Sequence, residues 1–472
     1  MLYAITGIVL ARVLSTEEIG LVGAVAIFQA FASLVIDSGF SSALLQRKHP
    51  TRLDYSTVLW FNLFAALVIY GLLYMAAPWI ASLFQNDARL VGLSRGMFVV
   101  LILNASAIVQ VNRLMKRMDV RMVAVANTAG LFLGGMAGIW LAVEGYGAWA
   151  IVWQTLIIAG VKSLVLWSTG RWLPVMRFSF TSLRSFAGVA SRMMGTSFLN
   201  TVFLNLYGFV IGNRVGLSSL GYYTQSDKWS KMGISSLSQV LTSTFVPTLA
   251  AVQNEDERFR KISSRLNRFT AYLLMPAMIG LMVMARPIFH FLFGSKWDPS
   301  IVLFQLLAFR GIFVVLNSLY NNYLLAKGEA GVIMKMEILR DTVALIALFV
   351  ALPFVGLSTP DNPVLGLEYL LWGQVAATVL TWIVTLVITC RVVGASKRVF
   401  LYDLVPYAAQ VALLAPVMAF CGHICPWAGG QVLIELIVGA GLYLLINHLA
   451  GSKIQGEVIR ELLGRNKESV TT

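Results

Sequence analysis

Three ionisable side chains lie close together within one long stretch of otherwise uncharged residues, and charges in such a setting need a partner or a water-filled cavity. Asp227, Lys228 and Lys231 fall about ten residues into a predicted helix, or ~14 Å along it. Asp227 and Lys231 are four residues apart and share one helix face, whereas Lys228 projects about 100° away from Asp227. One interpretation is a self-neutralising ion pair packed on a neighbouring helix. The other, which we favour, is that the extra positive charge binds an anionic substrate in a cavity.

Other polar residues within apolar segments extend this candidate site. Arg310 lies about 11 residues into its helix, which is also deep. Arg192 enters by about two turns, so its side chain could instead extend to the membrane surface. Asn205 could line a polar path, although helix-to-helix hydrogen bonds use the same residue type. The predicted substrate-binding residues are Arg192, Asn205, Asp227, Lys228, Lys231 and Arg310.

Two carboxylates are candidates for ion coupling, namely Asp37 and Asp227. Asp37 ends an apolar run and is followed by serines and a glycine, so it could equally cap or break a kinked helix. Glu337, Arg340 and Asp341 are better explained as a structural salt-bridge cluster within the membrane.

Composition identifies the elements that must position these residues. The 472-residue chain is 58% hydrophobic and 12% charged, with a mean hydropathy of +0.77, which is typical of a membrane protein with many spanning helices. A spanning helix needs about 20 residues. Fourteen segments qualify, except that the first has only about 14 residues, so its start could lie upstream. The predicted helices span residues 1–14, 18–45, 55–83, 90–111, 120–143, 147–167, 186–211, 218–249, 268–292, 300–326, 332–355, 365–389, 404–420 and 432–449.

The net charge of +14 is distributed by topology. Every second predicted loop is basic and the loops between are nearly free of Lys and Arg, as the positive-inside rule requires of cytoplasmic loops. This pattern argues against nucleic acid as a partner. It predicts an even number of helices, a multi-pass protein of the cell inner membrane, and cytoplasmic termini.

The chain also repeats itself. Residues 11–48 are echoed by residues 212–232, and RGMFVV at 95–100 is echoed by RGIFVV at 310–315. Internal repeats are common in secondary transporters. We therefore predict an all-α fold of two pseudo-symmetric six-helix lobes plus two C-terminal helices. The predicted divisions are 1–185, 186–395, the two accessory helices at 396–450 and a basic cytoplasmic tail at 451–472.

Sequence motifs for catalysis are lacking. There is no phosphate-binding loop, metal-spaced Cys/His set or paired-carboxylate loop, and three cysteines give no disulfide framework. No outer loop is large enough for a catalytic domain. We therefore expect a transporter without a cofactor or metal, and not an enzyme such as a glycan polymerase.

Several stretches carry a family resemblance in their order and spacing. They are LARVLSTEEIGLVG at 10–23, DSGFSSALLQRK at 37–48, STVLWFN at 56–62, GYGAWAIVWQ at 145–154 and LFGSKWDPSIVLFQLLA at 292–308. The chain resembles polysaccharide exporters of the colanic-acid and O-antigen flippase type, within the multidrug/oligosaccharidyl-lipid/polysaccharide superfamily.

The resemblance implies a function. Such exporters move undecaprenyl-diphosphate-linked oligosaccharide from the cytoplasmic to the periplasmic leaflet, for exopolysaccharide, O-antigen and lipopolysaccharide, or capsule biosynthesis. It implies a central cavity between the lobes, alternating access, and as partners the lipid-linked oligosaccharide, membrane lipids, a polysaccharide polymerase and chain-length proteins. The alternative is an ion-coupled drug exporter of the same superfamily, which should present acidic groups; Lys228, Lys231 and Arg310 argue against it.

Overall fold

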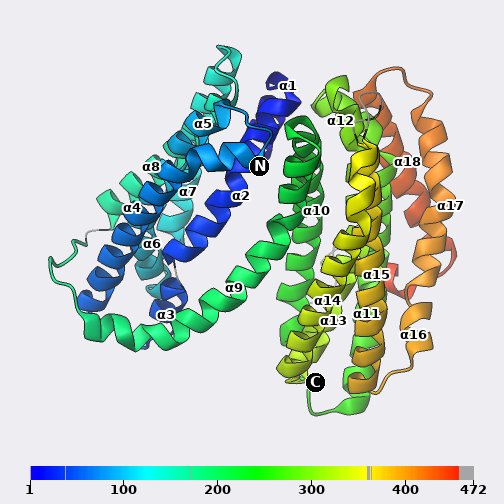
Figure 1. Ribbon diagram of the computed structural model, residues 1–472. Coiled ribbons are helices and arrows are strands. Elements are labelled where there is room, and N and C mark those ends of the chain that lie inside the picture. Colours follow the sequence, from blue (N-terminus) through cyan, green and yellow to red (C-terminus); the bar gives the residue numbers. More distant parts are fainter. Residues whose placement is uncertain (1, 38, 171, 359–361, 363, 457–472) are drawn as a thin grey trace. The chain divides into compact units, whose positions relative to one another are not determined.

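The computed structural model describes residues 2–37, 39–170, 172–358, 362 and 364–456. Every regular element in this part of the chain is a helix (Figure 1). Twelve helical segments of the described residues are long and apolar enough to cross a membrane. Helix α1 is apolar but shorter, and α10 has 34 residues but is too polar to be counted with the twelve. These fourteen segments correspond to the fourteen predicted ones, so the all-α polytopic fold is confirmed.

The chain forms two compact units, Met1–Thr224 (unit 1) and Gln225–Thr472 (unit 2), which divide within α10. The predicted boundary after residue 185 separates the two halves of the sequence repeat, which is a different division from that into compact units. It stays a prediction. Unit 1 holds α1 (Leu2–Val13), α2 (Thr16–Asp37), α3 (Phe40–Gln46), α4 (Arg52–Leu83), α5 (Arg89–Met97), α6 (Val99–Lys116), α7 (Val120–Val143), α8 (Ala148–Thr169), α9 (Phe180–Arg214) and the start of α10 (Leu217–Ala250). Unit 2 holds the rest of α10, α11 (Asp256–Val283), α12 (Ala285–Leu292), the 3₁₀ turn η1 (Ser295–Trp297), α13 (Asp298–Ala326), α14 (Ala330–Ala351), the 3₁₀ turn η2 (Leu352–Leu357), α15 (Leu365–Val393), α16 (Lys397–Tyr402), α17 (Val405–Gly422) and α18 (Ala428–Leu449).

A capping interaction starts α2 at the polar turn that the sequence places there. The backbone N–H of Glu18 donates to Ser15 Oγ at 3.2 Å, and the backbone N–H of Ser15 donates to the Glu18 carboxylate at 2.7 Å. These reciprocal bonds satisfy donors that the first turn of a helix leaves free. The turn between the first two apolar segments is therefore specified locally.

The two copies of the repeated motif pack against each other in unit 1. A Cβ atom on Gly20 of α2 would lie 1.8 Å from the carbonyl oxygen of Leu217, and one on Gly221 of α10 would lie 1.9 Å from that of Thr16. Thr16 and Gly20 have the same spacing as Leu217 and Gly221, so the contact is reciprocal. Only glycine allows the two backbones to approach this closely.

The predicted helix over residues 18–45 is wrong in one respect, because the structure ends α2 at Asp37 and begins α3 at Phe40. Gly39 has a φ of +72°, a left-handed conformation that interrupts a helix. The hydroxyl of Ser41 donates to the Asp37 carboxylate across this break. The predicted helix over 90–111 is likewise two helices, α5 and α6, separated at Phe98.

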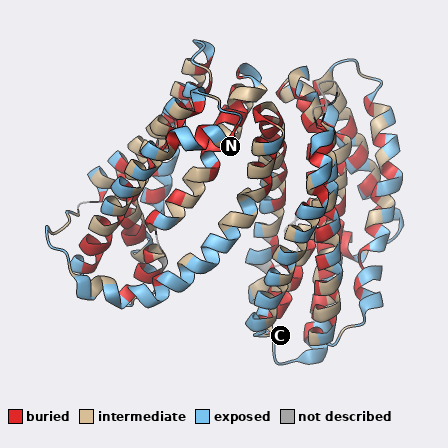
Figure 2. Cartoon of the chain, in the orientation of Figure 1, coloured by how far each residue is buried: buried red, intermediate tan, exposed pale blue. Residues whose placement is uncertain are grey.

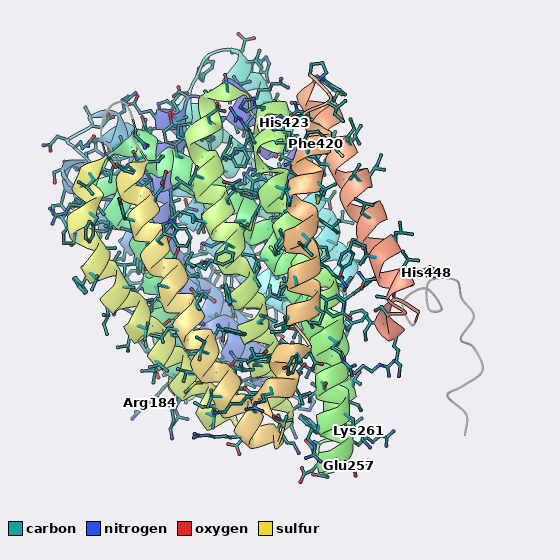
Figure 3. All side chains as sticks on the ribbon, turned by 90° about the vertical axis from the view of Figure 1, so that its right-hand side faces the viewer. Arg184, Glu257, Lys261, Phe420, His423 and His448 are labelled. Carbon is teal, nitrogen blue, oxygen red and sulfur yellow. The ribbon has the colours of Figure 1, made fainter. Side chains whose placement is uncertain are left out.

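The predicted helix over 268–292 also differs, since α11 begins at Asp256 and ends at Val283, before the short α12. The sequence before residue 268 is strongly charged, which predicts a loop between the helices over 218–249 and 268–292. Its charges support a helix instead, because Lys261 pairs with Glu257 at 2.7 Å and Phe259 is fully buried on the opposite face. Figure 3 shows Glu257 and Lys261 at one end of unit 2, with Phe420 and His423 of α17 and its following turn at the other.

The last two helices belong to unit 2 and pack against α11. The hydroxyl of Tyr443 in α18 donates to the carbonyl of Tyr272 in α11 at 2.9 Å. Tyr407 of α17 packs edge-on against the same Tyr272 ring, with the centroids 5.8 Å apart. The two additional C-terminal helices are thus present as predicted.

Candidate functional site

The polar face of α10 carries the three central candidate residues. Asp227 and Lys231 form an ion pair with 2.6 Å between Oδ2 and Nζ, and their side chains are 17% and 44% exposed. This confirms that the two share one helix face. Lys228 is half-buried, and its Nζ lies 5.8 Å from the centroid of the Trp229 ring. The Asp227 carboxylate therefore pairs with Lys231, one turn further along the helix.

The opposite face of α10 is anchored within unit 2. Ser226 and Ser230 are buried, and the hydroxyl of Ser226 donates to the carbonyl of Ser300 at 2.8 Å. The ring of Trp229 packs against Phe293, with the centroids 5.4 Å apart. This anchoring leaves Asp227, Lys228 and Lys231 on the less buried side of the helix.

Arg310 of α13 directly precedes a glycine that packs against α10. A Cβ atom on the adjacent Gly311 would lie 2.6 Å from Ile234, which is one turn beyond Lys231 on α10. The guanidinium Nε of Arg310 is buried and has no hydrogen-bond partner in the described part of the chain. The structure thus places a third cation, with an unused donor, in unit 2 beside α10.

The break after α2 brings Asp37 close to the α9 segment that carries Arg192. A Cβ atom on Gly39 would lie 2.5 Å from the carbonyl oxygen of Ala190 and 3.1 Å from Met193 Cβ. Arg192 itself is exposed. Asp37 and Arg192 therefore come from neighbouring segments of unit 1, a proximity that their separation in the sequence did not reveal.

The middle of α9 is the most exposed part of a predicted spanning helix in unit 1. Residues 191–200 are nearly all exposed and include four polar side chains besides Arg192 (Figure 2). Farther along, the Asn205 amide donates to the Thr201 carbonyl at 2.8 Å. The polar residues of α9 thus line an open surface of unit 1, and Asn205 uses a donor within its own helix.

A small polar cavity in unit 2 groups residues that the sequence did not connect. It has a volume of about 20 Å³, enough for about one water. Buried Oδ1 atoms of Asn317 and Asn321 have no hydrogen-bond partner among the described residues. The cavity is lined by Asn317, Asn321, Met336, Glu337, Arg340, Thr381 and Thr385. The sequence does contain one signal for this cavity. Asn317 and Asn321 are four residues apart, as are Thr381 and Thr385, so each pair shares one helix face.

The predicted salt-bridge cluster in α14 is confirmed. Arg340 lies 3.0 Å from Asp341 and 4.0 Å from Glu337. Among the described residues, no group of three or more His, Cys, Asp or Glu side chains could hold a metal ion.

The fold resembles those of two solved membrane transporters. The structure of a lipid II flippase, MurJ, in an inward closed conformation superimposes with a TM-score of 0.71 over 94% of this chain and 96% of that one, at 13% identity. A multidrug resistance MATE family transporter of the MOP superfamily, in an inward-facing conformation, gives a TM-score of 0.62 over 86% and 94%, at 18% identity. At these identities the likeness concerns the fold.

The sequence identifies the family within this class. The pattern of the polysaccharide biosynthesis protein family matches residues 9–302, which is more than half of the chain. The chain belongs to this family, as predicted. It is 27% identical to the succinoglycan biosynthesis transport protein ExoT of Rhizobium meliloti, over 70% of this chain and 67% of that protein.

Proposed function

We propose that this protein flips an undecaprenyl-diphosphate-linked oligosaccharide from the cytoplasmic to the periplasmic leaflet by alternating access. The observation that carries the proposal is the charge on α10 and α13. Lys228 and Lys231 lie on α10 and Arg310 lies on α13, and the carboxylate of Asp227 pairs with Lys231. A diphosphate accepts charge-assisted hydrogen bonds from such cations, and a family of polysaccharide biosynthesis provides a substrate class that carries one.

The cations explain why the substrate can enter an apolar protein segment. An unpaired charge is expensive at membrane depth, both for the diphosphate and for the lysines. Pairing the two offsets both costs while the substrate is bound. The Asp227–Lys231 ion pair limits the cost when the site is empty, since it leaves fewer charges without a counter-ion.

The proposed substrate-binding residues fall in both units. Arg192 and Asn205 are in α9 of unit 1, whereas Asp227, Lys228, Lys231 and Arg310 are in unit 2. We propose that the diphosphate contacts the cations of unit 2, and the substrate-binding roles of Arg192 and Asn205 stay predictions. Asp37 and Asp227 remain the candidates for ion coupling.

The substrate class is tested with inverted membrane vesicles that contain the intact protein. Their outer leaflet, which corresponds to the cytoplasmic one, is loaded with labelled undecaprenyl-diphosphate oligosaccharide, and its protection from an added glycosidase is followed. We expect protection to rise only in vesicles that contain the protein. Absence of glycolipid movement together with proton- or sodium-dependent ethidium uptake would instead support the alternative drug-exporter function.

The orientation is tested with two cysteines at opposite ends of unit 2. We propose that the end with Glu257 faces the cytoplasm and that the turn after α17, which holds His423 and Cys425, faces the periplasm; Figure 3 labels Glu257 and His423. A membrane-impermeant maleimide should label Cys425 in intact spheroplasts of a strain whose protein lacks the other cysteines. The Glu257→Cys variant of a protein without native cysteines should be labelled only after permeabilisation. The reverse pattern would invert the proposed direction of transport.

A further inference from the structure

A basic pocket of about 470 Å³ lies in unit 1, where α6 ends and α4 begins. Its cations come from three parts of the sequence, the turn after α3, the first residue of α4 and the end of α6. The cations that line the basic pocket are Lys48, Arg52, Arg113, Lys116 and Arg117. None of the described lining residues is Asp or Glu. The pocket therefore carries a formal charge of +5 that its own wall does not cancel.

Backbone carbonyl oxygens orient several of these cations. The guanidinium of Arg52 donates to the carbonyl of Leu173 at 2.9 Å, and Nζ of Lys116 donates to that of Leu45 at 2.7 Å. Arg113 donates to the carbonyl of Gly170. A carbonyl holds a cation in place without a negative charge, so the field of the pocket persists. Anions are expected to be attracted to it.

Arg113 is the buried member of the set. Its side chain is only 5% exposed in the folded chain, and its Nε has no hydrogen-bond partner in the part that the structure describes. A buried donor without a partner costs about 1–3 kcal/mol. An oxygen atom of a bound anion would satisfy this donor.

An aromatic wall completes the pocket. Trp172 packs edge-on against Tyr55 with centroids 6.3 Å apart, and the guanidinium of Arg113 lies 5.5 Å from the Trp172 ring centroid. The segment between α8 and α9, which carries Trp172, is held in place because Trp60 Nε1 donates to the carbonyl of Val175 at 3.0 Å. Trp is enriched where a membrane meets water, because its ring is apolar and its N–H is polar.

Apolar side chains are exposed on the segments that border the basic pocket. Met118 follows Arg117 directly and is 86% exposed, and Leu173 and Met176 follow Trp172 and are 70% and 84% exposed. A soluble phosphate would make no favourable contact with these exposed apolar side chains, whereas the acyl chains of a lipid would bury them. We propose that the basic pocket binds the phosphate headgroup of an anionic phospholipid, with its acyl chains against Met118, Leu173 and Met176. This proposal requires only that the protein lies in a membrane, and is independent of the transported substrate.

The test measures lipid binding by the purified full-length protein in detergent. Cardiolipin and phosphatidylglycerol are titrated against phosphatidylethanolamine, and bound lipid is counted by native mass spectrometry. The Lys48→Gln and Arg117→Gln changes remove exposed cations and preserve the buried Arg113, so both variants should fold. We expect each to weaken binding of the anionic lipids about fivefold, and both together about 25-fold.

The matched control removes charges near the starts of α7 and α9, outside the pocket. Arg121→Gln and Arg184→Gln, both at exposed positions, should change binding less than twofold. Equal losses in the control and pocket variants would overturn the proposal, because the charge would then act only through general attraction. Two further probes, sodium pyrophosphate and undecaprenyl diphosphate, are used as competitors. Displacement of cardiolipin by either at micromolar concentration would assign the pocket to a soluble diphosphate or to the carrier lipid, and would also overturn it.

Discussion

The molecule contains two groups of cations that are held in different ways. On α10, Lys231 is paired with a carboxylate 2.6 Å away. In the basic pocket, Arg52, Arg113 and Lys116 are oriented by carbonyl oxygens, and no Asp or Glu is found among the described residues of the wall. Water and ions can screen charges at the end of the helices but cannot do so at membrane depth. Under the proposed function the α10 cations lie at membrane depth, where partial neutralisation lowers their cost, whereas the helix ends tolerate an intact positive field.

The largest expected effect comes from the glycine contact that positions the start of α10. In Gly221→Ala, the new methyl group would collide with the carbonyl oxygen of Thr16, 1.9 Å away. We expect at least a tenfold loss of glycolipid flipping, because the start of α10 must shift. Binding of cardiolipin at the basic pocket should be retained, since its residues are on other helices.

The control for this change is Gly160→Ala, where a methyl group meets nothing within 4 Å. It should leave flipping unchanged and stabilise α8 slightly, as alanine favours helix more than glycine does. Loss of both functions in Gly221→Ala would mean that the protein misfolds, and equal activity of the two variants would show that the close approach is dispensable.

The next effect distinguishes two roles of Lys231, a positive charge needed for flipping and an ion-pair partner that stabilises the protein. Lys231→Met leaves Asp227 without its partner, so we expect both the protein level and flipping to fall several-fold. The double change Asp227→Asn with Lys231→Met should restore the protein level, because no charge is left unpaired, while flipping stays low. Protein level by immunoblot and flipping per molecule measure the two effects separately. Recovery of flipping in the double variant would assign the pair to stability alone.

Arg113→Gln tests the cations of the basic pocket that donate to backbone carbonyl oxygens. The change removes the charge-assisted bond to Gly170 and the contact with Trp172, so we expect a loss of about 1.5–3 kcal/mol in stability of unit 1. Thermal unfolding of the purified protein, followed by tryptophan fluorescence, should begin at a lower temperature. Arg113→Lys should recover part of the loss. An unchanged unfolding temperature would contradict the role given to this residue.

The smallest effect concerns a carboxylate-paired cation in the turn before α5. Hydrogen bonds from the Arg89 side chain, one of them 2.6 Å long, lower the pKa of Asp87 below its usual value. The stabilisation by Asp87 is therefore complete above pH ~4 and is lost as the pH falls through its lowered pKa in the folded protein. We expect less than about 1 kcal/mol, because Arg89 is half-exposed. Asp87→Asn should remove this part of the acid sensitivity in chemical denaturation, and an identical pH profile would contradict it.

Most of the fold could be predicted from the sequence, since hydropathy and loop charge report directly on spanning helices. All fourteen predicted segments are helical, including the polar α10. The errors lie where local polarity is ambiguous. The charged stretch before residue 268 reads as a loop, but it is helical, with Phe259 and Ser263 buried between surface charges. The break after Asp37 depends on the left-handed conformation of Gly39.

The candidate site could be predicted only in part. The spacing of Asp227 and Lys231 indicated a shared helix face, and the structure shows the ion pair that was the less favoured interpretation. The proximity of Arg192 to the turn after Asp37, and the approach of Arg310 to α10, depend on packing between distant segments. The basic pocket shows the same limit, since the loop charges indicated topology but not that five of them surround one cavity.

The charge dependence of glycolipid flipping tests the central claim most directly. Initial flipping rates in inverted vesicles are compared for the intact protein, Lys228→Ala, Arg310→Ala and the control Lys261→Ala. Lys261 also pairs with a carboxylate four residues away, but at the exposed start of α11. The account predicts at least a tenfold loss for the first two variants, at normal protein levels, and less than a twofold change for Lys261→Ala. Equal rates in all three variants would contradict the assignment of these cations to the diphosphate.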